Sequence, residues 1–371
     1  MSASSSEETM CDLVAVLLWA SPKSCFPQGR FLRGVYRNLP RVGRACWVPP
    51  VAIEDRCGRG VDEALPCRAF LAQRVMTRQP LQRVFRGPSI DLHYVEWPAG
   101  DAAVTVLLVH ANGFHGRCWD QCVAELPVDY RCVAVDMRGH GRSDKKGPYT
   151  WDRFSQDLAE LVDHLQLAGA VGVGHSMGGH CVAFAASLRP SAFSRLLLVD
   201  PVILPPEVYR QLNRSGFSSA EEHPVSRRRN RWNSWQEMVE RFSSRHPFSL
   251  WHTQVLEDYC RHGLLPDPEG DGWVLACPPL VEASIYTGSS TPDAGEEIYR
   301  RIGQIDCPTT ILRAPPREFG EAQAMDFSAS PTWEELASRF ANGRDVLLEE
   351  LTHFIPMQAP DLVAQFISGQ R

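Results

Sequence analysis

The sequence predicts an α/β fold with a mostly parallel central sheet, helices flanking that sheet and an inserted helical cap. Three observations predict it. From about residue 83, short apolar runs of strand length alternate with amphipathic helical patterns; the alternation stops between about residues 205 and 302; and it then resumes. Alternating strands and helices form parallel sheets that bind ligands at the carboxyl ends of their strands. The candidate catalytic residues fall at those ends.

The folded domain, residues 83–371, is expected to begin with a β-hairpin. A turn at Gly87-Pro88 separates Val84-Phe85 from residues 93–97, where apolar and polar side chains alternate. The run at residues 104–110 is short, rich in β-branched residues and almost wholly apolar, as expected for a central strand covered on both faces. The same texture recurs at residues 132–136, 170–174, 195–200, 309–312 and 345–348.

Helical patterns lie between these strands. The clearest has an apolar stripe made of Trp151, Phe154, Leu158, Leu161, Val162 and Leu165. In the cap, residues 205–302, one helix is expected around residues 232–242 and another over residues 250–265. The cap also holds aromatic side chains that either line an apolar substrate pocket or form the cap's own core: Trp232, Trp235, Phe248, Trp251 and Tyr286.

Residues 1–82 are expected to be a partly disordered N-terminal extension, because they are rich in Arg, Pro and Cys and show weak periodicity. Arginines recur there at spacings of three and four, at positions 30, 33, 37, 41 and 44. This pattern weakly indicates a basic helical face that targets an organelle or binds an acidic surface, but Gly34, Pro40 and Gly43 interrupt any helix. We favour a solvated extension and a cytoplasmic protein. The apolar run at residues 13–20 is shorter than the roughly 20 residues of a membrane helix.

The composition is that of a globular protein acting on a small molecule. Of the 371 residues, 44% are hydrophobic and 22% charged, which allows a large buried core. The formal net charge of -6 gives no general attraction to nucleic acid or to anionic membranes. The 12 cysteines are scattered, which favours reduced thiols. Cys118 and Cys122 have no second ligand pair nearby, so no metal site is expected.

The motif with the clearest chemical meaning is Gly-x-Ser-x-Gly at residues 174–178. It follows an apolar strand and precedes a helix, which is the context of a nucleophilic serine. Gly174 and Gly178 allow a tight, strained turn in which a β-carbon would collide with neighbouring backbone. Ser176 is therefore the candidate nucleophile.

A base and an oxyanion hole are expected on two other segments. His353 follows the last strand, after the serine in chain order, and an imidazole of ordinary pKa near 6.5 exchanges protons near neutral pH. Residues 110–114 end the first long strand, where the amide of Asn112 can act with the amide of Met177 to hold an oxyanion. The alternative is that His110 and Asn112 only stabilise this loop.

Together these motifs resemble the α/β-hydrolase superfamily. Residues 136–144, Asp-Met-Arg-Gly-His-Gly-Arg-Ser-Asp, add a segment that its members often carry after an early strand. The resemblance covers about residues 83–366 and is specific for the superfamily but not for a substrate. It implies the α/β-hydrolase fold, a serine that acts with a histidine and an acid, and a structural role for residues 136–144.

The acid partner of His353 stays open. The strand at residues 309–312 is followed by Arg-Ala-Pro-Pro-Arg-Glu, where the family usually has Gly-x-x-Asp. Asp200, which ends another strand, occupies the alternative position used in some relatives, whereas Glu318 lies nearest the usual position and Asp326 follows it. We favour Asp200, whose other interpretation is an acid that caps a strand end.

The expected activity is hydrolysis of an ester-like or related carbonyl substrate, with a medium-sized apolar acyl group, through an acyl-enzyme on Ser176. No metal or organic cofactor is required. A basic run at residues 227–231 meets either an acidic substrate or, as we favour, solvent. The competing hypotheses are a non-catalytic ligand-binding protein of the same fold and a C–C hydrolase, lyase or transferase. Met177 replaces the third glycine of a nicotinamide fingerprint, which disfavours that class.

Overall fold

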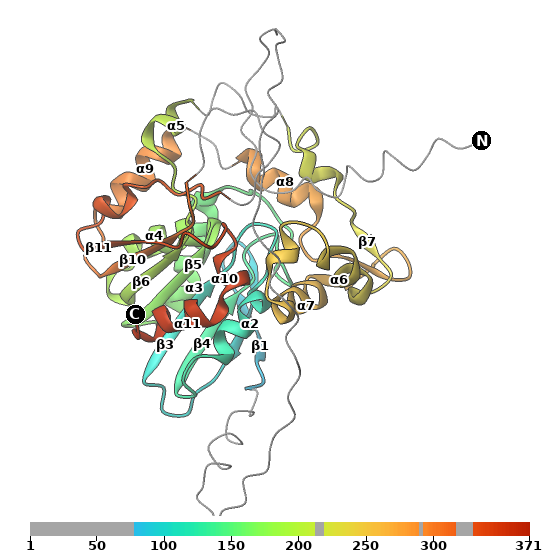
Figure 1. The fold of residues 1–371 in the computed structure, drawn as a ribbon, viewed down its shortest axis with the longest axis horizontal. Coiled ribbons are helices and arrows are strands. Elements are labelled where there is room, and N and C mark those ends of the chain that lie inside the picture. The colour runs from blue at the N-terminus through green and yellow to red at the C-terminus, as the bar shows by residue number, and fades with distance from the viewer. Residues whose placement is uncertain (1–77, 212–218, 289–291, 317–328) are drawn as a thin grey trace, which may run out of the picture. The chain divides into compact units, whose positions relative to one another are not determined.

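The computed structural model describes residues 78–211, 219–288, 292–316 and 329–371. Nearly all of the expected N-terminal extension, with its arginine pattern and its apolar run, lies outside these ranges, and so do Glu318 and Asp326. The described residues centre on one large sheet with helices on both faces (Figure 1). The α/β-hydrolase fold expected from the sequence is confirmed.

Eight strands form the large sheet of the described residues. In chain order they are β1 (Leu81–Arg86), β2 (Asp91–Trp97), β3 (Val104–Val109), β4 (Tyr130–Val135), β5 (Ala170–His175), β6 (Phe193–Val199), β10 (Thr309–Arg313) and β11 (Gly343–Leu347). Their order across the sheet is β1-β2-β4-β3-β5-β6-β10-β11. β2 pairs antiparallel with β1 and β4, whereas the other neighbours are parallel. The predicted hairpin and the mostly parallel sheet are both confirmed.

Helices connect the strands and pack on the sheet. Those that pack directly on the large sheet or follow it are α2 (Asp120–Ala124), α3 (Trp151–His164), α4 (Met177–Leu188), α9 (Pro292–Ile302), α10 (Ile355–Gln358) and α11 (Pro360–Ser368). Those between β6 and α9 are α5 (Pro206–Gln211), α6 (Trp235–Ser243), α7 (Thr253–His262) and α8 (Pro279–Gly288). The short 3₁₀ helices are η2 (Gly116–Trp119), η3 (Pro190–Ala192), η5 (Pro224–Arg227), η6 (Phe248–Leu250) and η7 (Leu336–Arg339).

Side chains of β3 divide between two hydrophobic cores. Leu107 and Val109 pack with residues of α3, α4 and α9, whereas Val106 and Leu108 pack with residues of α2 and α11. Successive side chains of a strand point to opposite faces, so a fully buried strand requires a helical layer on each face. All four side chains are completely buried, as the continuous apolar run predicts.

Helix α3 forms where its sequence pattern predicts a helix. The Thr150 side chain caps it by accepting a hydrogen bond from the Arg153 amide at 3.4 Å. The apolar stripe faces the core, where Phe154, Leu158 and Leu161 are fully buried. The prediction of an amphipathic helix from Trp151 is therefore confirmed.

The region between β6 and α9 also contains a small sheet that the sequence analysis did not predict. Its strands have the order β7 (Arg231–Trp232), β9 (Trp273–Leu275) and β8 (Leu264–Pro266). The placement of Trp232 in a helix is wrong, because Ser234 caps α6 by accepting from the Glu237 amide at 3.1 Å and the helix begins after it. The assignment of residues 205–302 to an inserted cap stays a prediction.

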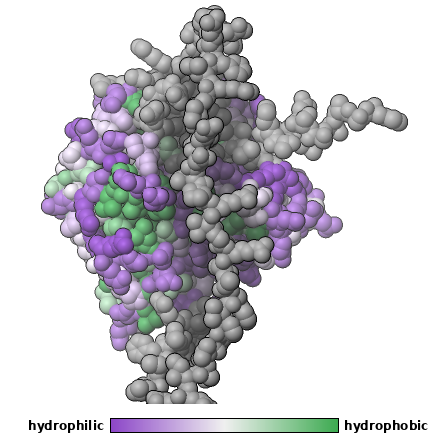
Figure 2. Space-filling model, viewed as in Figure 1, coloured by the Kyte–Doolittle hydropathy of each residue, from purple (hydrophilic) through white to green (hydrophobic). Residues whose placement is uncertain are grey.

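One face of α6 and α7 builds an apolar cluster in the predicted cap. Met238, Phe242 and Val255 are buried in it, together with Phe114 and Phe354 from the loops that follow β3 and β11. The other faces of these helices are polar, and Figure 2 shows mainly hydrophilic side chains on this side (right). The cluster therefore holds the predicted cap against the carboxyl ends of the strands. No helix within the described ranges combines the length and the apolar character needed to cross a bilayer.

Removing a large side chain from the core is expected to destabilise the fold strongly. Leu158 is fully buried between α3 and the sheet, so Leu158→Ala should lower the free energy of unfolding by about 2–5 kcal/mol, since it leaves a cavity. Val128 is 77% exposed, and Val128→Ala should change it by less than about 0.5 kcal/mol. Urea denaturation of both variants measures the difference, and equal stabilities would contradict this account of the core.

Candidate active site

Ser176 lies at the sharp turn between β5 and α4. Its backbone has φ 58°, a left-handed conformation that is uncommon for a residue with a side chain. The turn is possible because Gly174 and Gly178 have no side chains: a β-carbon on Gly174 would collide with the Gly178 carbonyl, and one on Gly178 with the Val109 carbonyl. The strand–turn–helix context predicted for Ser176 is therefore present.

His353 lies in the loop between β11 and α10, and its side chain meets Ser176. Its Nε2 is 3.1 Å from Ser176 Oγ, although the two residues are 177 positions apart. The backbone oxygen of His353 also accepts a hydrogen bond from His175 Nε2 at 2.9 Å, which ties the histidine loop to the end of β5. Both members of the pair are buried, with Ser176 5% and His353 1% exposed.

Asp200 is the acid that contacts His353 in the described residues. It ends β6 with φ 44°, and its Oδ2 is 2.6 Å from His353 Nδ1. Its Oδ1 accepts hydrogen bonds from the Ala314 amide at 3.1 Å and from Ser330 Oγ at 2.6 Å. A buried carboxylate needs such donors, because water no longer solvates it. The position of Glu318, the alternative acid, lies outside the described residues.

These contacts define the direction of proton transfer. Because Asp200 is a hydrogen-bond acceptor, His353 Nδ1 carries a proton and donates it to the carboxylate. The neutral ring then presents a lone pair on Nε2, and Ser176 Oγ–H donates to it. The arrangement can move a proton from the serine hydroxyl to the imidazole while the acid stabilises the resulting charge.

The two proposed oxyanion donors lie on either side of this turn. Met177 is the first residue of α4, and the first amides of a helix have no partner within the helix. Asn112 follows β3, and its side-chain Nδ2 donates to the Glu282 carbonyl of α8 at 3.3 Å. The side-chain amide is therefore engaged by the predicted cap. The donor that the oxyanion proposal uses is the backbone amide of Asn112.

Two buried histidines hold the loop that carries Asn112. His140 Nδ1 donates to the Arg138 carbonyl at 2.9 Å, so its Nε2 accepts the Gly113 amide proton at 3.0 Å. His110 Nδ1 donates to the neighbouring Ala111 carbonyl at 2.7 Å, and its Nε2 accepts from the Met137 amide at 2.9 Å. Sequence reasoning assigned no contact to His140, since only the tertiary structure brings it to Gly113.

Burial keeps both of these rings neutral. It lowers the pKa of His110 from its ordinary 6.5 to about 4, and it lowers the pKa of His140 well below 6.5. A neutral ring is required here, because a doubly protonated imidazole has no lone pair to accept the amide proton. The loop geometry is thus maintained at any pH near neutral.

Residues 136–144 form hydrogen bonds with neighbouring loops. Asp136 accepts from the Gly116 amide at 2.7 Å and from the Arg142 amide at 2.9 Å. Burial alone would raise the pKa of Asp136, but its hydrogen bond and charge interaction with His93 hold it far below the ordinary value. Arg138 pairs with Asp157 at 2.7 Å, and both side chains are buried. These partners lie on a loop, on β2, on η2 and on α3, in keeping with the structural role that the resemblance implies.

The sequence analysis favoured solvent exposure for the basic run at residues 227–231, but this is only partly correct. Arg231 is exposed to solvent, with 57% of its side chain accessible. Arg228 is instead mostly covered, with 11% of its side chain exposed, and it forms an ion pair with the fully buried Glu282 and donates to Tyr259 Oη at 3.2 Å. The sequence contained a signal that Glu282 needs a partner of opposite charge, because Glu282 is the only charged residue of the otherwise mostly apolar helix α8. Burial raises the pKa of Glu282, and the nearby Arg228 opposes that rise.

Four of the five cap aromatics belong to the apolar cluster of the predicted cap, whereas a role in lining a substrate pocket stays a prediction. Trp232, Phe248 and Trp251 pack in the cap's own cluster, with the Phe248 and Trp251 rings 4.8 Å apart. Trp235 packs at the edge of the same cluster. Tyr286 differs, since it is not part of that cluster and its ring stacks on His223, with the ring centroids 5.1 Å apart.

A group with metal-ligand chemistry occurs away from Ser176. Asp120, Asp258 and His262 each place one potential ligand atom within 4.8 Å of the others. Asp120 is already bound by Arg117, whose Nε is 2.8 Å from Oδ1, and Asp258 accepts from Gln121 at 2.7 Å. Since protein donors already satisfy both carboxylates, we assign no metal to this group.

Comparisons with known proteins identify the family to which the chain belongs. A family model described as the alpha/beta hydrolase family matches residues 106–366. Among curated proteins, the lipase LipV of Mycobacterium tuberculosis is 38% identical over 115 residues, which are 31% of this chain and 43% of that protein. The bifunctional esterase/perhydrolase DCH of Acinetobacter calcoaceticus is 36% identical over 104 residues, 28% of this chain and 37% of that protein. The matched segments thus span less than half the length of these curated relatives.

Solved structures agree on the fold. An E-2-(acetamidomethylene)succinate hydrolase superposes with a TM-score of 0.60 at 17% identity and covers 78% of this chain and 98% of its own. The thioesterase domain from the curacin biosynthetic pathway superposes with a TM-score of 0.59 at 17% identity, covering 78% and 99%. At this identity the similarity concerns the fold alone.

The histidine on the helix that follows Ser176 is expected to make stability depend on pH. Burial lowers the pKa of His180 from 6.5 to about 3, so between these values the unfolded chain binds a proton that the folded protein does not. Stability due to this group therefore falls as pH falls below 6.5. Relative to His180→Phe, the wild type should lose about 2 kcal/mol between about pH 7 and pH 5. Urea denaturation at both pH values tests this, and a pH-independent difference would contradict it.

Proposed function

The chain belongs to the alpha/beta hydrolase family, and on this basis we propose that it is a serine hydrolase that cleaves an ester-like or related carbonyl substrate through an acyl-enzyme on Ser176. One observation carries the proposal: the continuous buried chain of hydrogen bonds from Ser176 Oγ to His353, at 3.1 Å, and from His353 to Asp200, at 2.6 Å. A serine, a histidine and an acid in this order form the arrangement that activates a hydroxyl nucleophile.

In the first half of the proposed reaction, Ser176 Oγ attacks the substrate carbonyl carbon while His353 Nε2 takes the hydroxyl proton. The resulting imidazolium is stabilised by Asp200, whose other oxygen is held by Ala314 and Ser330. His353 then protonates the leaving group as the carbon–oxygen bond breaks, which leaves the acyl group on Ser176.

The negative charge that develops on the carbonyl oxygen requires donors. We assign this role to the backbone amides of Met177 and Asn112. The Met177 amide lies at the N-terminus of α4, where the helix dipole favours negative charge. The contacts of Gly113 with His140 and of the Asn112 side chain with Glu282 support the loop that presents the second amide. Losing one such donor typically raises the barrier by roughly 3–4 kcal/mol.

In the second half, water replaces the leaving group. His353 Nε2 removes a proton from the water as its oxygen attacks the acyl carbon, and it then returns that proton to Ser176 Oγ as the acyl–serine bond breaks. The products are an acid and, for an ester substrate, an alcohol. Neither half requires a metal or an organic cofactor.

The proposed substrate carries a medium-sized apolar acyl or ester group. The apolar cluster that includes Phe114 and Phe354 lies next to both segments of the proposed site, and His353 itself contacts the Phe354 ring at 5.6 Å. The lipase and the esterase among the curated relatives support the same class. Product analysis distinguishes this reaction from carbon–carbon bond cleavage or acyl transfer, which the same fold can host.

Replacing the proposed nucleophile should abolish ester hydrolysis. Ser176→Ala is expected to lower kcat for a series of p-nitrophenyl esters by roughly four to six orders of magnitude, because no other hydroxyl meets His353 Nε2 among the described residues. Ser187→Ala, on the same helix, is the matched control and should retain activity, since Ser187 Oγ only donates to the Phe184 carbonyl. Equal rates for the wild type and Ser176→Ala would reject the mechanism, and reaction of the wild type alone with a fluorophosphonate probe would support it.

The two candidate acids can be separated by amide substitutions. Asp200→Asn keeps the shape of the side chain but removes the charge that orients His353, so kcat should fall roughly 10⁴-fold with little change in KM. Glu318→Gln should leave kcat nearly unchanged. The reverse pattern would assign the acid to Glu318.

A further inference from the structure

Two buried hydroxyl groups, those of Ser330 and Thr332, meet the acid of the proposed site. Ser330 Oγ donates to Asp200 Oδ1 at 2.6 Å. Thr332 Oγ1 donates to the Pro201 carbonyl at 2.8 Å, and it lies 3.3 Å from Asp200 Oδ1. The exposed fractions of Ser330 and Thr332 are only 1% and 4%. One hydroxyl therefore holds the carboxylate of Asp200, and the other holds the backbone that follows it.

The Ser330 hydroxyl is itself fixed in one orientation. Its oxygen accepts a hydrogen bond from the Thr332 amide at 3.0 Å, and the Ser330 amide donates to the Pro315 carbonyl at 2.8 Å. A serine hydroxyl has one proton to donate, and with its oxygen engaged in this way that proton points to Asp200. The donor is thus in place before any substrate binds.

Asp200 requires such donors, because neither its backbone nor its side chain selects the observed orientation. Its φ of 44° lies in the left-handed region, which is uncommon for a residue with a side chain. The outer torsion of an aspartate side chain has a broad, roughly two-fold distribution. Rotation about that bond would move Oδ2 away from His353 Nδ1, which is now 2.6 Å from it. The donors on Oδ1 therefore favour the rotamer in which Oδ2 faces His353.

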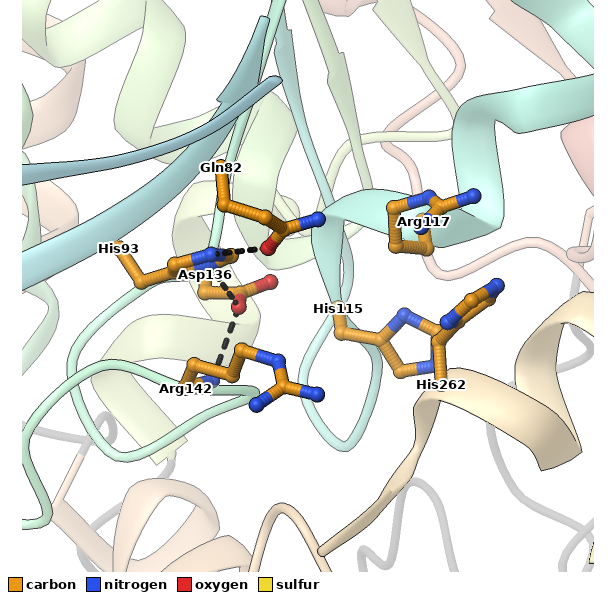
Figure 3. A pocket seen from close by; sticks show the side chains of 7 residues that line it. All are labelled: Gln82, His93, His115, Arg117, Asp136, Arg142 and His262. Carbon is orange, nitrogen blue, oxygen red and sulfur yellow. Dashed lines mark hydrogen bonds and ion pairs between the residues drawn. The ribbon is translucent and has the colours of Figure 1, made fainter. Parts of the chain in front are cut away.

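A second buried aspartate–histidine pair occurs in the molecule and has different surroundings. Asp136 lies 2.8 Å from His93 Nδ1, and its carboxylate oxygens accept from two backbone amides. The other nitrogen of His93 is 2.6 Å from Gln82 Oε1, so both ring nitrogens are engaged by the protein (Figure 3). In the proposed active site, His353 Nε2 meets Ser176 Oγ instead. The His93 pair is thus a built-in reference for the same type of hydrogen bond without a nucleophile.

We propose that Ser330 and Thr332 are positioning residues for the acid of the proposed site, an inference that rests on the proposed function. Ser330 fixes the plane of the Asp200 carboxylate, and Thr332 fixes the backbone that carries it. The acid can then hold His353 in the tautomer and orientation that proton transfer requires. The described part of the segment after β10, where the family usually has its acid, thus supplies donors to an acid on another strand.

The kinetic test measures p-nitrophenyl ester hydrolysis by full-length variants. Ser330→Ala should lower kcat roughly 10- to 100-fold with KM little changed, because a hydrogen bond to a charged group is lost. Thr332→Val should lower kcat roughly 3- to 10-fold, since a neutral hydrogen bond is lost, whereas Thr332→Ser keeps the hydroxyl and should retain the rate. Ser338→Ala is the matched control, because the exposed Ser338 hydroxyl donates to the Glu335 carbonyl.

A spectroscopic test on the same proteins needs no turnover. The His353 Nδ1 proton, which lies between the ring and Asp200, should give a proton resonance far downfield of the amide region, assigned by its loss in His353→Gln. Ser330→Ala should shift or broaden this resonance, because the carboxylate is no longer held in one orientation. The corresponding His93 proton, bonded to Asp136, is the internal reference and should not move.

The outcomes separate this inference from the proposed hydrolase activity. A lower kcat in Ser330→Ala together with a displaced His353 resonance supports the positioning role. An unchanged resonance or an unchanged kcat in Ser330→Ala overturns it and leaves the hydrolase proposal intact, and equal losses in Thr332→Val and Thr332→Ser contradict a role for that hydroxyl. A wild type that neither hydrolyses esters nor reacts with a fluorophosphonate rejects the proposed function instead, and the resonance then still decides whether Ser330 orients Asp200.

Discussion

The structure depends on one constraint, the sharp turn that holds Ser176 at the end of a fully buried strand. The turn brings Gly178 so close to the Val109 carbonyl of β3 that no side chain fits between them, and it gives Ser176 a left-handed backbone. Parallel pairing of β5 with β6 then places Asp200 next to the turn, because the ends of parallel strands meet at one edge of the sheet. His353 completes the set from the loop beyond β11. The helical layers, which bury β3 and β5 on both faces, keep these ends in register.

Around this turn the protein uses neutral histidines as connecting groups. His110 and His140 each donate from Nδ1 to a carbonyl and accept an amide proton at Nε2, so they link the loop after β3 to residues 136–144. Burial keeps both rings uncharged, which preserves their ability to accept. The same effect makes stability depend on pH. As the pH falls, the unfolded chain binds protons at these histidines that the folded protein cannot bind, so the free energy of unfolding decreases.

The loop after β3 connects three parts of the molecule. Asn112 faces the proposed cap through the Glu282 carbonyl, and Gly113 contacts His140. A few residues further on, the Gly116 amide binds Asp136. Buried polar contacts thus occur on both sides of the segment that presents the proposed oxyanion donor. Such contacts are costly when incomplete, so they favour one loop conformation over alternatives.

The sequence by itself determined the fold class, the turn at Ser176 and the position of His353, because each depends on short patterns in which local residue order controls conformation. The family resemblance also favoured Asp200 as the acid, since it occupies the alternative position used in some relatives. Only the tertiary structure decided that Asp200 meets His353, that Arg228 pairs with the buried Glu282 and that His140 holds Gly113. The start of α6 after Trp232 was likewise beyond the sequence. These features arise from contacts between residues far apart in the chain, and no local spacing encodes which distant groups will meet.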